Sequence, residues 1–174
     1  MSKQFLGKSN IVLVGPMGVG KTTIGRHLAK NLKLRFKDSD REIEKRTGVD
    51  IPLIFELEGE VGFRKRESAV IESLCSEGAL VLATGGGAVI DETSRRLMRD
   101  GGTVIYLCAD VSHLLSRTSK DIKRPLLQTE NPEQRIKDLL AARDPLYREM
   151  ADLVVNTGDR SVKSVIKEIL QRLN

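Results

Sequence analysis

The feature that most constrains the fold is a glycine-rich segment near the start of the chain, residues 15–22, with the sequence GPMGVGKT. It fits the pattern G-x-x-x-x-G-K-[ST], follows the apolar run 11–14, and precedes a stretch of helical character from 21 to about 31. Glycines allow successive backbone N–H groups to converge on phosphate oxygens, and the N-terminus of the following helix adds a favourable dipole. The segment therefore predicts a strand, a phosphate-binding loop and a helix, with a nucleoside triphosphate as the ligand.

The end of this loop carries the side chains expected to act on the phosphates. Lys21 is expected to supply a positive charge to the β- and γ-phosphates, and Thr22 a hydroxyl to Mg²⁺. A chance glycine-rich turn is the competing interpretation, and the flanking strand and helix count against it. The loop does not indicate which molecule receives the phosphate.

The rest of the chain alternates short apolar runs of β character with helical stretches. We expect strands at 11–14, 34–37, 80–83, 104–107 and 153–155. We expect helices at about 21–31, over most of 41–77, at 92–99, up to about 118, at 132–151 and at 162–173. Strands joined by helical crossovers pair in parallel and are buried on both faces, so we predict a three-layer α/β/α domain with a five-stranded parallel sheet. A length of 174 residues suits one domain, 1–174.

Ligands of such sheets bind at the carboxyl ends of the strands. Two carboxylates, Asp38 and Asp40, end the second predicted strand. In an extended chain residues two apart point to the same side, so one could hold a metal-bound water near Thr22 while the other meets an acceptor hydroxyl. Alternatively, this is a solvated strand end and Asp40 caps the helix that follows. The residues alone leave both interpretations open.

Two further segments could contact an acceptor. Arg64 and Glu67 lie three residues apart and share a helix face, and an Arg held by a Glu presents a planar fork that suits a carboxylate. The alternative is an ordinary surface ion pair. Residues 85–87 are three glycines directly after the third predicted strand, where backbone can approach a ligand closely, although a tight turn would have the same composition.

Three more arginines are candidates for binding anions. Arg124 lies in the polar, proline-containing loop 119–131 and could act as an arginine finger in cis. Arg117 could lie over the adenine or its phosphates, and Arg143 is another candidate anion contact. Each of them, taken singly, is more often a solvated side chain.

Composition narrows the class of protein. A net charge of +5 and a pI near 9.3 suit anionic ligands, whereas 3% aromatic residues provide no aromatic-interleaved basic stripe for single-stranded nucleic acid. No apolar run approaches the ~18 residues of a membrane span, and the first ten residues lack the apolar core of a signal peptide. We therefore expect a cytoplasmic protein with no nucleic-acid or membrane partner. Cys75 and Cys108 are expected to be free thiols in the core, and His27 and His113 to be helix-surface residues.

Taken together, these segments resemble the shikimate kinases, a branch of the nucleoside-monophosphate-kinase-like (NMP-kinase-like) P-loop NTPase proteins. The resemblance covers about residues 10–172. Its motifs are Gly15 to Thr23, Asp38-Ser39-Asp40, Gly59-Glu60 with Phe63-Arg64, Gly85-Gly86-Gly87, Arg124-Pro125-Leu126-Leu127, and Arg143 with Pro145-Leu146-Tyr147. The resemblance implies transfer of the γ-phosphate of ATP, with Mg²⁺, to the 3-hydroxyl of shikimate, a step of chorismate and aromatic amino acid biosynthesis. A monomer is expected.

The resemblance also implies roles for single residues. The nucleotide would contact Gly15, Gly18, Val19, Gly20, Lys21, Thr22, Thr23, Arg117 and Arg124. The acceptor carboxylate would contact Arg64 and Arg143, and its ring hydroxyls Asp40 and the backbone of Gly85, Gly86 and Gly87. The metal would lie by Thr22 and Asp38, and Lys21, Asp40 and Arg124 would be catalytic. The acceptor-binding region would span about 38–77 and a lid about 119–130.

One segment departs from the family pattern. Many members carry a Pro shortly after an Arg in the loop that binds adenine, whereas residues 156–161 here, NTGDRS, are followed by Val162. Contacts to the base are therefore expected mainly from backbone.

Two other functions stay open. The first is a kinase of another small hydroxyl compound, such as gluconate. The glycine run 85–87, together with Arg64 and Arg143, counts against it. The second is a catalytically silent nucleotide-binding regulator. The intact Lys21, Thr22 and Asp40 count against that alternative.

Overall fold

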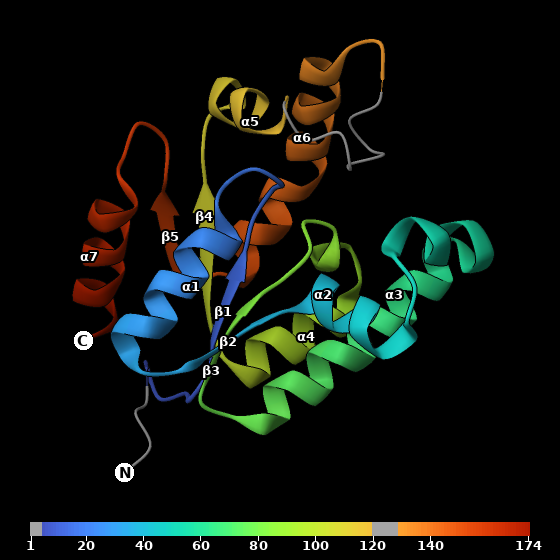
Figure 1. The fold of residues 1–174 in the computed structure, drawn as a ribbon. Helices are drawn as coiled ribbons and strands as arrows, with labels where there is room; N and C mark the ends of the chain where they lie inside the picture. Colours follow the sequence, from blue (N-terminus) through green and yellow to red (C-terminus); the bar gives the residue numbers. More distant parts are fainter. Residues whose placement is uncertain (1–4, 120–128) are drawn as a thin grey trace.

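The computed structural model describes residues 5–119 and 129–174, which form a parallel sheet with helices on both faces (Figure 1). The strands are β1 (Ile11–Val14), β2 (Arg35–Asp38), β3 (Leu80–Ala83), β4 (Thr103–Cys108) and β5 (Leu153–Asn156). All pairs are parallel, and the order across the sheet is β2-β3-β1-β4-β5. The predicted five-stranded parallel sheet is confirmed, and each predicted strand end lies within one residue of the observed one.

The helices form the two outer layers. They are α1 (Lys21–Leu32), α2 (Ser39–Thr47), α3 (Ile51–Glu77), α4 (Glu92–Gly101), α5 (Val111–Thr118), α6 (Pro132–Met150) and α7 (Val162–Leu173), with a short 3-10 turn η1 (Ala88–Ile90) after β3. Helices α1 and α7 cover one face of the sheet and α3 and α4 the other, while α5 and the start of α6 stand beyond the strand ends (Figure 1). The helical region predicted over 41–77 is two helices, and the longer one is kinked at Gly59 (φ 69°, ψ −176°).

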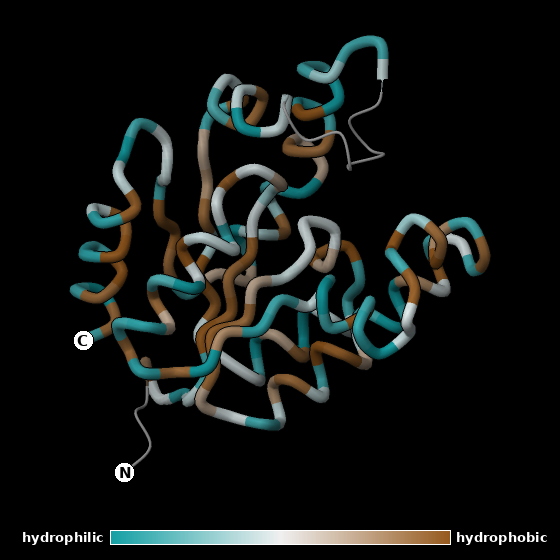
Figure 2. The backbone as a smooth tube through the Cα atoms, in the orientation of Figure 1, coloured by the Kyte–Doolittle hydropathy of each residue, from teal (hydrophilic) through white to brown (hydrophobic). Residues whose placement is uncertain are grey.

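Alternation along the strands builds one core on each face of the sheet. Ile11 and Leu13 of β1 belong to the core shared with α1 and α7, whereas Val12 and Val14 belong to the core shared with α3 and α4. The central strands β1, β3 and β4 are accordingly continuously hydrophobic, whereas the edge strand β2, with the sequence RFKD, is mostly polar (Figure 2). Aliphatic side chains make up most of both cores; the buried aromatic rings are Phe5 in the first core and Phe63, Tyr106 and Tyr147 in the second.

The two cysteines are free thiols, as predicted. Their expected place in the core is wrong, because Cys75 and Cys108 are only partly buried and lie at the edge of the second cluster. Both pack against that cluster from its partly exposed margin. Among the described residues, no helix is long and apolar enough to cross a membrane.

Strand order brings three loops together at the carboxyl edge of the sheet. Leu13 in β1 and Asp38 in β2 both pair with Ala83 in β3, so the segments that follow these three strands begin at the same level. Because β3 lies between β1 and β2, the glycines 85–87 emerge between the phosphate-binding loop and the start of α2. The sequence predicted the edge, and the strand order decides which loops are neighbours there.

Candidate active site

The glycine-rich loop connects β1 to α1, in the context predicted for it. Gly18 and Gly20 adopt left-handed backbone angles (φ 81° and 103°), and Gly20 is the residue that precedes the first turn of α1. Residues with side chains are strained in that region, so these positions need glycine. Lys21 Nζ donates to the carbonyl oxygens of Gly15 (2.6 Å) and Pro16 (2.9 Å), which places its charge over the loop. The arrangement is suited to phosphate groups.

Asp38 joins this loop to the acceptor side of the site. Its Oδ2 accepts a hydrogen bond from the Thr22 hydroxyl (3.1 Å), and its Oδ1 accepts from the backbone N–H groups of Asp40 (3.0 Å) and Arg41 (3.3 Å). Asp38 is therefore the N-cap of α2, and the interpretation of Asp40 as that cap is wrong. The physical reason is that Asp38 has the extended conformation a cap requires, whereas Asp40 is already helical.

The expectation that Asp38 and Asp40 share one side of an extended segment is also wrong, because the chain turns into α2 between them. The two carboxylates nevertheless remain electrostatic neighbours. Burial and, after it, the nearby charge of Asp38 raise the pKa of Asp40 from 3.8 to about 6, against the opposing effect of Lys21 and Arg64. Asp40 is thus a carboxylate that can exchange a proton near neutral pH.

The predicted pair of Arg64 and Glu67 is formed on α3. Arg64 Nη1 lies 2.8 Å from Glu67 Oε1, and its Nη2 lies 3.3 Å from Glu60 Oε1. Glu67 is fully buried, so the alternative of an ordinary surface ion pair does not hold. Burial raises the pKa of Glu67 to about 7, although Arg64 opposes the shift. Arg64 Nε and Glu67 Oε2 have no hydrogen-bond partner within the described structure, which leaves polar capacity for a ligand.

The three glycines of residues 85–87 each face a different part of the site. A Cβ atom at Gly85 would lie 2.8 Å from Asp40 Oδ1, and one at Gly87 would lie 2.9 Å from the guanidinium carbon of Arg64. A Cβ at Gly86 would lie 3.5 Å from the Met17 nitrogen and 3.7 Å from Arg143 Nη1. The segment therefore packs backbone directly against every acceptor-side group. A tight turn alone does not explain three such contacts.

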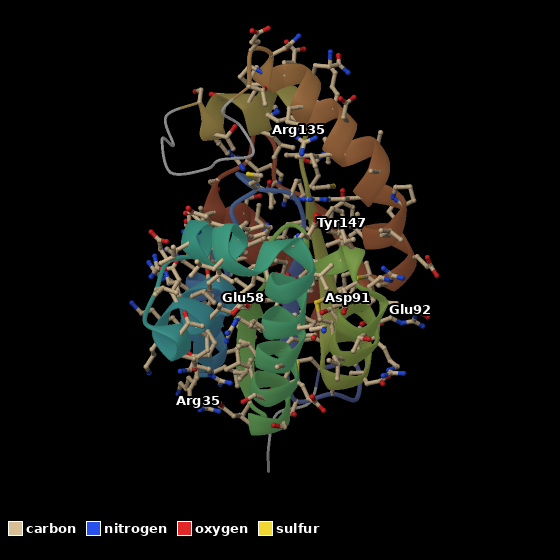
Figure 3. The ribbon with its side chains drawn as sticks, turned by 90° about the vertical axis from the view of Figure 1, so that its right-hand side faces the viewer. Arg35, Glu58, Asp91, Glu92, Arg135 and Tyr147 are labelled. Atoms are coloured by element: carbon tan, nitrogen blue, oxygen red, sulfur yellow. The ribbon has the colours of Figure 1, made fainter. Side chains whose placement is uncertain are left out.

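Arg143 lies on α6, close to the glycine segment. Its residue is 9% exposed, although arginine is rarely buried without a partner. One helical turn later, the hydroxyl of Tyr147 donates to the carbonyl oxygen of Gly86. Tyr147 lies on the part of α6 beside the strand ends, whereas Arg135 lies toward the beginning of the helix (Figure 3). Helix α6 thus presents Arg143 and Tyr147 to the glycine segment.

Arg117, near the end of α5, connects the phosphate-binding loop to the segment after β5. Its Nη1 donates to the carbonyl oxygens of Val19 (3.0 Å) and Gly18 (3.3 Å), and its Nη2 donates to the carbonyl oxygen of Thr157 (3.2 Å). The Thr157 hydroxyl also donates to the Val19 carbonyl (3.0 Å). Hydrogen bonds therefore join residues 156–161, the segment predicted to bind adenine, to the phosphate-binding loop.

The structure brings together most of the predicted site residues: Gly15, Gly18, Val19, Gly20, Lys21, Thr22, Thr23, Asp38, Asp40, Arg64, Gly85, Gly86, Gly87, Arg117 and Arg143. Arg124 and most of the predicted lid lie outside the described residues. Sequence reasoning gave no role to Tyr147 or Thr157. The spacing of four between Arg143 and Tyr147, which places both on one helix face, was the available signal for the first.

Comparisons with known proteins agree with this geometry. A family model described as shikimate kinase matches residues 17–174. A shikimate kinase of Thioalkalivibrio sulfidiphilus is 61% identical over 161 residues, which are 92% of this chain and 85% of that protein. A solved shikimate kinase of Acinetobacter baumannii in complex with shikimate is 54% identical with a TM-score of 0.90, over 94% of this chain and 92% of the other.

A solved gluconokinase of Sinorhizobium meliloti is a more distant structural match. It has 16% identity and a TM-score of 0.60 over 98% of this chain and 93% of the other. At that identity the likeness shows a common fold alone.

Proposed function

The chain belongs to the shikimate kinase family, and from that premise we propose that it transfers the γ-phosphate of ATP to the 3-hydroxyl of shikimate, giving shikimate 3-phosphate and ADP. The observation that carries the proposal is the glycine segment 85–87. It lies between the phosphate-binding loop on one side and Asp40, Arg64 and Arg143 on the other. Two arginines and a carboxylate around a glycine backbone without side chains suit a small molecule with one carboxylate and several hydroxyls.

The acceptor side would divide its work between the two ends of shikimate. Arg64 and Arg143 would bind the carboxylate, because planar guanidinium groups donate two parallel hydrogen bonds to it. Asp40 and the backbone of the glycine segment would contact the ring hydroxyls. This arrangement would hold one hydroxyl toward the phosphate-binding loop and fix the geometry of attack.

Asp40 would take the proton of the attacking hydroxyl. Its pKa of about 6 leaves it mostly ionised at neutral pH and still basic enough to accept a proton as the new P–O bond forms. The leaving group is ADP, whose negative charge would be stabilised by Lys21 and by backbone N–H groups of the phosphate-binding loop and the start of α1. Arg117 would lie beside the adenine, since it bridges the loop around Val19 to Thr157.

Thr22 and Asp38 would hold Mg²⁺ together with the phosphates of ATP. Their oxygens are 3.1 Å apart, and a hydroxyl with a carboxylate is the type of oxygen set that Mg²⁺ accepts. Among residues 5–119 and 129–174 no group of three Asp, Glu, His or Cys side chains could hold a metal ion. This fits an ion that takes its other ligands from the nucleotide phosphates. When bound, the ion neutralises phosphate charge.

We also propose a division of the single domain 1–174 into a core, an acceptor-binding region at about 38–77 and a lid at about 119–130 whose Arg124 reaches the phosphates. The kink at Gly59 supports a distinct acceptor-binding region, because it separates two helical pieces.

Two free thiols are typical of a cytoplasmic protein, and we expect this protein to be a monomer in the cytoplasm.

The proposed function is tested by measuring ADP release with ATP and a panel of hydroxy acids that includes shikimate and gluconate. We expect saturable ADP release with shikimate and none above background with gluconate. Release that is equal with and without shikimate would contradict the proposal. Detection of shikimate 3-phosphate by mass spectrometry separates transfer from ATP hydrolysis.

A further inference from the structure

Tyr147 occupies a junction that neither the phosphate chemistry nor the predicted acceptor contacts explain. It is fully buried, and its hydroxyl donates to the carbonyl oxygen of Gly86. Gly86 is the middle residue of the glycine segment, and it is the one that faces both the phosphate-binding loop and Arg143. The phenol therefore holds the segment at the position where the two halves of the site meet.

The same phenolic oxygen is also a neighbour of Arg143. Burial raises the pKa of Tyr147 to about 12, while the charge of Arg143 and a hydrogen bond from it act in the opposite direction, followed by the charge of Arg64. The phenol consequently stays protonated at neutral pH. It can donate its proton to Gly86 and accept from Arg143 at once, because a hydroxyl is both donor and acceptor.

The ring of Tyr147 is held in place by a second tyrosine. Tyr106 in β4 stacks on it with ring centroids 4.8 Å apart and an interplanar angle of 27°. The Tyr106 hydroxyl points to a different partner, donating to Asp144 Oδ1 at 2.6 Å, and Asp144 is itself paired with Arg148 at 2.8 Å. The stacked pair thus combines one hydroxyl directed to the site with one directed to an ion pair at the surface of α6.

We propose that Tyr147 is a positioning residue for the acceptor. Its phenolic oxygen contacts both Arg143 and the Gly86 carbonyl and holds them at a fixed distance from each other. The inference rests on the proposed function, since the acceptor is the one named there. It assigns Tyr147 no contact with ATP or with the reacting atoms. Its effect is on the distance between two groups. One is the Arg143 guanidinium on α6, which binds the carboxylate, and the other is the Gly86 backbone in the loop after β3, which faces the ring hydroxyls. The Tyr147 oxygen fixes both.

The expected consequence is selective. Removing the hydroxyl leaves the Gly86 carbonyl without its donor and takes away an acceptor of Arg143, so the site must reorganise when the acceptor binds. We expect the KM for shikimate to rise about tenfold, the size of effect that one lost buried hydrogen bond produces. The KM for ATP should not change, because the phosphate-binding loop keeps its own contacts, and kcat should stay within about twofold.

The kinetic test compares Tyr147→Phe with Tyr106→Phe. Both variants remove one buried hydroxyl from the same stacked pair and preserve the ring, so a general loss of packing or stability would affect them alike. We expect the shikimate KM to rise in Tyr147→Phe alone, with similar melting temperatures for the two. Equal shikimate KM values for wild type and Tyr147→Phe, an equal rise in both variants, or a rise in the ATP KM instead would each overturn the inference.

A second measurement needs no change at Tyr147. The chain contains only two tyrosines, so in Tyr106→Phe a ¹³C-tyrosine label reports the phenol carbon of Tyr147 alone. Titration with shikimate should shift that resonance with the same saturation curve as binding followed by calorimetry. Calorimetric binding with an unmoved resonance would overturn the positioning role, whereas no binding and no turnover in the wild type would contradict the proposed function itself.

Discussion

Gly87→Ala tests whether the close packing of the glycine segment serves the acceptor or only the fold. Gly87 has φ −92° and ψ 0°, which alanine also adopts, so the substitution introduces no backbone strain. The new methyl group would overlap the guanidinium of Arg64 and would lie 2.9 Å from its Cζ and 3.0 Å from its Nη1. The perturbation therefore falls on one end of one flexible side chain.

The magnitude follows from that overlap. Ordinary contact begins at 3.4 Å, so Arg64 Cζ must retreat from 2.9 Å by about 0.5 Å, and its Nη2 by more. A fork that moves this far no longer donates two aligned hydrogen bonds to a carboxylate. Loss of one charge-assisted bond costs about 1.5–3 kcal/mol, which raises the shikimate KM by about 10- to 150-fold.

Stability should change little, because a flexible side-chain end can move away. We expect a change in the free energy of unfolding of about 1 kcal/mol or less. Gly101→Ala is the matched control, since its methyl group would lie 2.6 Å from Cβ of Cys75, between α3 and α4 and away from the site. A Cβ atom moves only with its backbone, so this variant should melt at a lower temperature and keep the wild-type shikimate KM.

The assay is steady-state ADP release with each substrate varied in turn, together with thermal melting. The reasoning predicts that Gly87→Ala separates substrate affinity from stability and that Gly101→Ala does the reverse. An unchanged shikimate KM in folded Gly87→Ala would refute the assignment of Arg64 to the acceptor carboxylate. A rise in the ATP KM alone would place Arg64 on the other substrate.

Four further predictions concern Lys21, the two carboxylates and pH; the first three use the same assay, and the last uses urea unfolding. Lys21→Ala should abolish turnover while circular dichroism stays native, because Lys21 acts by charge over the phosphate-binding loop. Asp40→Asn should lower kcat roughly 100-fold, whereas Asp38→Asn should raise the Mg²⁺ requirement; rescue of the first variant alone by excess Mg²⁺ would reverse the two roles. In the wild type, kcat/KM for shikimate should rise with pH through about 6, as Asp40 loses its proton, and a flat profile from pH 5 to 7 would contradict its role as base. The pKa of Asp40 is raised from 3.8 to about 6 in the folded state, so between these pH values the native state binds more protons than the unfolded state. Asp40 therefore lowers the free energy of unfolding as pH rises through this interval. Urea unfolding of Asp40→Asn should lack this pH-dependent decrease.

The sequence predicted the fold because its signals are local. Strand and helix positions follow from hydrophobic periodicity within short windows, and the phosphate-binding loop is defined by eight consecutive residues whose turn chemistry and flanking elements all lie within about twenty positions. The pair of Arg64 and Glu67 is likewise a spacing of three on one helix. These inferences needed no knowledge of which strand lies beside which.

Errors arose where a boundary depended on geometry. We expected residues 38–40 to be extended, and the alternative interpretation made Asp40 the cap of the next helix; both were wrong. Asp38 instead both ends β2 and caps α2, which a pattern of alternating acidic residues does not reveal. Boundaries are set by one or two backbone angles, and those depend on how the next helix packs.

The sequence by itself determined the nucleotide loop, the layered architecture and the candidate arginines and carboxylates. Only the tertiary structure decided that the glycines 85–87 lie against Asp40, Arg64 and Arg143, that Glu67 is buried, and that Tyr147 contacts both Gly86 and Arg143. These contacts link residues far apart in the chain, and they exist because β3 inserts between β1 and β2 while α6 returns to the strand ends. Local patterns specify each element, but the order in which strands pair is settled by the packing of all elements together, so the neighbours in the site are a property of the folded chain.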